Sequence, residues 1–160
     1  MVTLNKLAKV CSSLNKYAVE YIIIGGCAIF IHGYERMTQD IDVLINANDK
    51  NIEKFKMALG EFLPEACKEL TNNDIKENAV IRMVSEDLII DVIHRIGDFD
   101  YKTIKNDIII EEIYGVKILV AGLNSMLKLK QGVRETDKKD FLFLLGKKKY
   151  LDEQKNDKSA

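Results

Sequence analysis

The segment from Ile22 to Ile45 constrains this chain more than any other, because two short apolar runs flank a glycine pair and a turn. The first run ends at Gly25 and Gly26, and the second contains Asp40 and Asp42. This order predicts a strand, a short helix and a second strand in immediate succession. Because side chains alternate faces along a strand, the two aspartates are expected on one face, roughly 6–7 Å apart.

Such a strand–helix–strand unit carries the chemistry for binding a metal and a phosphate. Two neighbouring carboxylates repel each other, and a cation between them removes the repulsion. Hard divalent ions such as Mg²⁺ take oxygen ligands, usually one or two carboxylates together with substrate phosphates. Glycine lets the backbone approach a ligand closely, and a helix N-terminus offers free N–H groups to phosphate. The sequence therefore predicts a phosphate-binding turn directly before a metal-binding strand.

A third acid interrupts another apolar run. Asp91 lies in the predicted strand Leu88–Ile93, and a lone carboxylate in a buried strand is costly unless it meets a cation or a donor. Either Asp91 joins the other two aspartates around a cation, or it pairs with Arg82 or Arg95.

These residues follow the order of a known family. The segment resembles the DNA polymerase β-like nucleotidyltransferase superfamily, and within it the small stand-alone bacterial members. Several of those members belong to toxin–antitoxin or abortive-infection systems. The first part of the resemblance rests on Gly25, Gly26, Ala28, His32, Gly33, Arg36, Thr38, Asp40 and Asp42. A second part, at Leu123, Leu127, Lys130, Arg134, Lys139 and Asp140, extends it over about residues 20–145.

The resemblance implies an α/β (α+β) nucleotidyltransferase fold with a mixed, twisted sheet of about four or five strands flanked by helices. It also implies transfer of a nucleoside monophosphate from a nucleoside triphosphate to an acceptor, with release of pyrophosphate. Two Mg²⁺ ions, or Mn²⁺, would be held by Asp40 and Asp42. Asp91 would share one ion and help to take the proton of the acceptor hydroxyl. The amides of Gly25 and Gly26 would hold the β- and γ-phosphates.

Four further residues are candidates for binding the nucleotide. Arg36 and Thr38 precede the acidic strand and are expected to contact phosphate, although Arg36 fits equally well as a counter-ion of the acids or as a support of the turn. Lys130 and Arg134 are four residues apart on one helical face, which suits a triphosphate, an anionic acceptor or plain solvent.

The remaining pattern predicts one domain over residues 1–146 and a charged, disordered tail over residues 147–160. Pro64 marks a break, and residues 67–78 are expected to contain a turn near Thr71. Predicted helices are Thr3–Tyr17, Gly26–His32, Asn51–Phe62, Leu123–Gly132 and Thr136–Leu145; predicted hairpins are Ala79–Val84 with Leu88–Ile93, and Ile108–Ile113 with Val116–Val120.

Composition bears on the binding partners of the protein and on its cellular compartment. A net charge of −1 provides no global basic field for nucleic acid. Three cysteines without C-x-x-C spacing are expected to be reduced thiols of a cytoplasmic protein, and neither a signal peptide nor a membrane span is predicted.

Two functions are consistent with the sequence. The first is the metal-dependent nucleotidyltransferase, whose acceptor is a small molecule, a tRNA or a protein. A chain of 160 residues leaves little surface for an acceptor, so a protein partner or a homodimer is expected to complete the site. The second is a non-catalytic module that binds a nucleotide or a partner, such as one half of a toxin–antitoxin pair.

Overall fold

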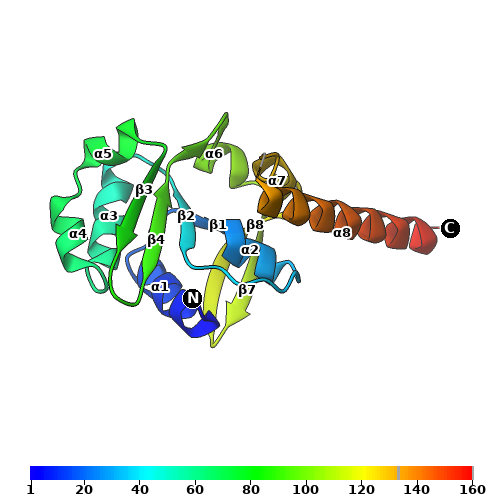
Figure 1. Cartoon of the computed structure of the whole chain (residues 1–160), viewed down its shortest axis with the longest axis horizontal. Coiled ribbons are helices and arrows are strands. Elements are labelled where there is room, and N and C mark those ends of the chain that lie inside the picture. Colours follow the sequence, from blue (N-terminus) through cyan, green and yellow to red (C-terminus); the bar gives the residue numbers. More distant parts are fainter. Residues whose placement is uncertain (133, 160) are drawn as a thin grey trace.

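Six strands form one mixed sheet in the order β3-β4-β2-β1-β8-β7 (Figure 1). This computed structural model describes residues 1–132 and 134–159. The strands are β1 (Tyr21–Ile24), β2 (Ile41–Ile45), β3 (Val80–Val84), β4 (Ile89–Ile93), β7 (Ile108–Ile113) and β8 (Val116–Ala121), and a separate small ribbon pairs β5 (Arg95–Ile96) with β6 (Phe99–Asp100). The mixed sheet confirms the predicted fold class. Its strand count exceeds the expected four or five because both predicted hairpins join the central pair, one on each side.

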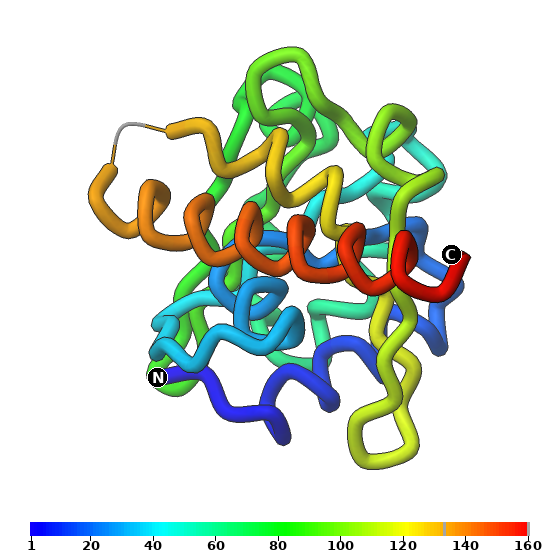
Figure 2. The backbone as a smooth tube through the Cα atoms, turned by 90° about the vertical axis from the view of Figure 1, so that its right-hand side faces the viewer, coloured from blue at the N-terminus to red at the C-terminus, as the bar shows by residue number. Residues whose placement is uncertain are grey.

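Eight helices flank the sheet within the described part of the chain. They are α1 (Leu4–Lys16), α2 (Gly25–Ile31), α3 (Asp49–Leu59), α4 (Pro64–Glu69), α5 (Asn72–Glu77), α6 (Tyr101–Ile104), α7 (Leu123–Leu129) and α8 (Glu135–Ser159). Helices α1 and α3 pack against each other, and α7 packs against the start of α8. In Figure 2, α8 crosses the face of the molecule that is turned toward the viewer.

Local sequence explains where several helices begin. Thr3 and Asn48 cap α1 and α3 by accepting hydrogen bonds from backbone amides in the first turn. Thr71 forms a reciprocal capping box with Asp74, so the turn expected there is the start of α5. The break expected at Pro64 is the first residue of α4, where a missing N–H costs nothing.

The prediction of a disordered tail is wrong, because α8 continues through the charged segment to Ser159. The segment after Gly146 contains no proline or further glycine, and Lys, Leu, Glu and Gln favour helix. A tertiary contact also fixes the start of this charged segment, at Lys147. Lys147 Nζ donates to the backbone oxygen of His32 at 2.7 Å and lies 3.4 Å from its Nδ1. Beyond this contact the helix is exposed and projects from the body (Figure 1).

The core surrounds β1, whose four residues are all buried. Strand β3 lies at the sheet edge and is mostly exposed, as expected for a strand with only one neighbour. Among helices within residues 1–132 and 134–159, none is long and apolar enough to span a membrane.

Candidate active site

The register of the two neighbouring strands β2 and β4 places their acidic residues side by side in the sheet. Strands β2 and β4 run parallel with Asp42 opposite Asp91, which places the third acid directly beside the Asp-Ile-Asp strand. On the other side of β2, antiparallel β1 brings Ile24, the residue before the glycine pair, opposite Asp42. Asp40 lies just before β2. Asp42 on β2, Asp91 on β4 and the glycines at the end of β1 therefore lie side by side across three neighbouring strands.

Gly25 and Gly26 begin α2, and both positions require glycine. Gly25 has a φ of +64°, and a Cβ atom there would collide with the carboxylate of Asp42. A Cβ atom on Gly26 would lie 2.5 Å from Thr38 Oγ1. The glycine pair thus lets the acidic strand and the turn before it approach the start of α2.

Arg82 is the immediate partner of two of the acids. It stands on β3 opposite Asp91. Its Nε donates to Asp91 Oδ1 at 2.8 Å, and its Nη2 lies 2.7 Å from both Asp91 Oδ2 and Asp40 Oδ2. Of the two partners that the sequence suggested for Asp91, the structure shows Arg82. Counting outward from the predicted turn at residues 85–87 would have placed Arg82 opposite Ile90. The observed register, with Val84 opposite Ile89, is shifted by one residue and brings Arg82 opposite Asp91.

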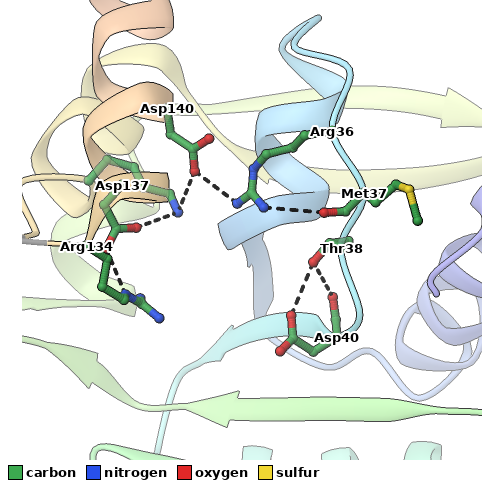
Figure 3. A network of polar contacts seen from close by, with 8 residues as sticks. Arg36, Met37, Thr38, Asp40, Arg134, Asp137 and Asp140 are labelled. Carbon is green, nitrogen blue, oxygen red and sulfur yellow. Dashed lines mark hydrogen bonds and ion pairs between the residues drawn. The ribbon is translucent and has the colours of Figure 1, made fainter.

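The segment before β2 fixes the position of Asp40. The Thr38 hydroxyl lies 3.2 Å from Asp40 Oδ1 and 3.3 Å from its backbone oxygen (Figure 3). Arg36, two residues earlier, extends toward α8 and donates from Nη2 to Asp140 Oδ2 at 2.9 Å. Arg36 therefore pairs with an acid outside the Asp40–Asp42–Asp91 cluster.

The opposite wall is a second ionic group built from the end of α7 and the start of α8 (Figure 3). Lys130 Nζ lies 3.0 Å from Asp140 Oδ2 and 3.2 Å from Asp137 Oδ1. The Lys130 side chain is 10% exposed, whereas Arg134, which bonds Asp137 at 2.9 Å, is 81% exposed. Burial raises the pKa of Asp137, but the hydrogen bonds from Arg134 and Lys130 outweigh burial and lower it overall. Asp137 did not stand out in the sequence, because a single acid near a helix start is common.

Electrostatics of the acid cluster favour a bound cation. Burial is the main reason that the pKa of Asp42 rises to about 6, and the negative charges of Asp40 and Asp91 raise it further. The positive charge of Lys130 and the Gly26 amide lower it by less. The carboxylate nearest the glycine pair is therefore undercompensated in the protein alone.

All the residues that the sequence predicts for the site line one cleft of about 600 Å³. They are Gly25, Gly26, Arg36, Thr38, Asp40, Asp42, Asp91, Lys130 and Arg134, and Arg82 lines the cleft with them. Within the residues that the structure describes, no three His, Cys, Asp or Glu side chains are grouped closely enough to hold a metal ion. Asp42 and Asp91 lie opposite each other on neighbouring strands, and Arg82 is bonded to Asp91 and Asp40.

The arrangement of the sheet and the acid-lined cleft define a nucleotidyltransferase fold, and solved structures agree. An antigenic nucleotidyltransferase-like protein from Paracoccidioides brasiliensis superposes with a TM-score of 0.57 at 17% identity, covering 89% of this chain and 75% of that one. A candidate nucleotidyltransferase from Thermotoga maritima superposes with a TM-score of 0.58 at 16% identity, covering 94% of this chain and 92% of that one.

The sequence itself places the protein in a family. Residues 3–157 match the family described as "Nucleotidyl transferase of unknown function (DUF2204)", and the chain belongs to it. No curated protein has a significantly similar sequence.

Proposed function

We propose that this protein is a metal-dependent nucleotidyltransferase that moves a nucleoside monophosphate from a nucleoside triphosphate to an acceptor hydroxyl. The observation that carries the proposal is the shared cleft, which is lined by the three carboxylates, by the glycine pair and by Lys130. Family and fold support the transferase class. A cytoplasmic location would supply nucleoside triphosphates for this reaction, and its reducing conditions suit the three free cysteines, Cys11, Cys27 and Cys67.

By its chemistry the donor set suits Mg²⁺ or Mn²⁺, and a shared ion would require the three carboxylates to move closer together than they lie in this structure. Asp40, Asp42 and Asp91 offer only oxygen atoms, which hard divalent ions prefer. The bonds of Arg82 to two of these acids indicate that positive charge is favourable there. Bound in pairs, such ions stabilise the attacking and leaving oxygens of an in-line displacement at phosphorus. The three aspartates would hold them.

The remaining residues have separate roles in the proposed reaction. The acceptor oxygen forms a bond to the α-phosphorus, the bond from that phosphorus to the bridging oxygen breaks, and pyrophosphate leaves. Asp91 would take the acceptor proton once Arg82 has released it. The backbone of Gly25 and Gly26 and the ammonium of Lys130 border the same cleft and would bind the triphosphate, with Arg134 at its exposed rim.

A thermal-shift titration tests this function. The protein is heated with ATP, GTP, CTP or UTP, each with and without Mg²⁺, beside an Asp40→Asn/Asp42→Asn variant. A ligand at 100 times its Kd adds roughly 2.7 kcal/mol of stability. We expect a metal-dependent rise in Tm with at least one nucleotide, absent in the variant. No rise with any nucleotide would contradict the proposal.

The pairing of Arg82 with Asp91 and Asp40 also favours a second candidate, a non-catalytic module that binds a nucleotide or a protein partner. In that case the acids have a structural role, and Asp42→Asn leaves the binding of the partner intact. In the enzyme, the same substitution abolishes transfer to the acceptor. A partner subunit or a second copy that completes the acceptor site is compatible with both candidates.

A further inference from the structure

Arg82 uses the carboxylate oxygens that a metal ion would need. Both oxygens of Asp91 and one of Asp40 accept hydrogen bonds from its guanidinium, at 2.7–2.8 Å. Charge-assisted bonds of this length are among the strongest in proteins, and the two to Asp91 are bidentate. In the protein alone, these acids therefore already have a cation.

The position of Arg82 allows its side chain to leave. It extends from edge strand β3, which has a neighbour on one side only, and its side chain is 55% exposed. It also lines the cleft that contains the glycine pair and Lys130. A guanidinium released from the acids would stay beside this cleft, and its flat fork matches phosphate oxygens as well as carboxylate oxygens.

We propose that Arg82 is a built-in competitor of the metal and makes metal binding conditional on a triphosphate. A divalent ion alone must break the bonds of Arg82 to Asp91 and Asp40 without replacing them. A triphosphate offers the released guanidinium new acceptors, so metal and triphosphate strengthen each other's binding by the same factor. This inference rests on the proposed function, because it assigns Arg82 a role at the same acidic site.

The first test measures Mn²⁺ binding without any nucleotide, by the electron paramagnetic resonance signal of free Mn²⁺. Arg82→Met keeps the aliphatic stem and removes the charge. We expect it to lower the Kd for Mn²⁺ at least tenfold relative to wild type. Arg95→Met is the matched control, because Arg95 is an exposed arginine for which no ion pair is found among the described residues. It should leave the Kd unchanged. Arg82→Gln repeats the test if Arg82→Met fails to fold.

The second test uses inorganic tripolyphosphate with Mg²⁺ in thermal melts, so that no base preference enters. In wild type the two together should raise Tm by more than the sum of their separate effects, and in Arg82→Met the rise should be close to additive. An unchanged Mn²⁺ Kd in both Arg82 variants would overturn the role of Arg82. Failure of every protein to bind Mn²⁺, with or without tripolyphosphate, would instead overturn the metal site and the proposed function with it.

Discussion

At the scale of single residues, the site depends on the backbone conformation of Gly25 and on the charge of Asp42. Gly25 has a positive φ and lies where any Cβ atom would meet Asp42. Asp42 in turn has a raised pKa, because it is buried and lies near the negative charges of Asp40 and Asp91. Each residue leads to a prediction for which the chain offers a control.

Gly25→Ala should cost both stability and nucleotide binding. A left-handed conformation costs a side chain roughly 1–2 kcal/mol, and the new methyl group would displace the Asp42 carboxylate. Gly97→Ala is the control, since Gly97 has a φ of +56° but no atom lies within 4 Å of the place that a Cβ would occupy. Urea denaturation should show a loss for both variants, larger for Gly25→Ala. Only Gly25→Ala should lose the Tm shift with Mg²⁺ and nucleotide, and equal behaviour of the two would refute the contact argument.

Asp42 should make the metal-free protein less stable as pH rises. Its pKa is about 6 in the folded state against an ordinary 3.8, so the folded protein binds this proton more tightly than the unfolded chain does. The contribution is full below about pH 4 and is lost as pH rises through about 6. One pKa unit corresponds to about 1.4 kcal/mol, so the loss is on the order of 2–3 kcal/mol.

The measurement is urea denaturation in EDTA between about pH 4 and 7.5, comparing wild type with Asp42→Asn. The free energy of unfolding of wild type should fall relative to the variant across this range. Comparison with the variant cancels the acids that titrate elsewhere in the chain, such as Asp49 and Asp74, whose pKa values are lowered. A difference that stays constant with pH would show that Asp42 is not the group responsible.

At the scale of elements, α8 supplies the acids that hold two other segments in place. Asp140 is fully buried and pairs with Arg36 from the turn before β2 and with Lys130 from the end of α7. Within the described residues, its Oδ1 atom and Arg36 Nε are buried without a hydrogen-bond partner. The hydrogen-bonding capacity of this ionic group is therefore only partly satisfied. Its ion pairs fix the position of α8 relative to the cleft.

Asp140→Ala should be severely destabilising, by about 3–5 kcal/mol, because removing one partner of a buried ion pair leaves the other charge uncompensated. Glu135→Ala, which breaks the exposed pair with Lys138 on the same helix, should cost less than about 1 kcal/mol. Chemical denaturation of both variants gives the comparison. Similar losses in the two would mean that the buried group contributes no more than a surface pair.

At the scale of the whole molecule, the cleft lies between two parts that are distant in the chain. One wall is the β1–α2–β2 unit with β4, and the other is the junction of α7 with α8. A nucleotide that contacts both walls should slow amide hydrogen exchange in both. We expect protection at residues 25–28 and at residues 134–140 when Mg²⁺ and the nucleotide that raises Tm are added, with α3 unchanged as the internal reference. Protection on one wall only would contradict a ligand that bridges the cleft.

The central unit, both hairpins and most of the long helices were predictable from the sequence. Their signals are local: apolar alternation in the strands, glycines after β1, and capping residues such as Asn48. The acids, the glycine pair and Lys130 could be named as site candidates because their spacing resembles that of a known superfamily. The expected disordered tail was wrong, because α8 continues to Ser159. The helix propensity of its Lys, Leu, Glu and Gln residues could be read from the sequence, but the contact of Lys147 with His32 could not.

The sequence by itself determined the α/β class, the strand–helix–strand unit and the identity of the acids, because each follows from residues close together in the chain. Only the tertiary structure decided which cations meet which acids. The pairing of Arg82 with Asp91 and Asp40 depends on the register of three strands. The contacts of Lys130 and Arg36 with Asp140 join segments that are up to 104 residues apart. Such pairings are set by how the sheet and α8 pack, and neither periodicity nor composition encodes that geometry.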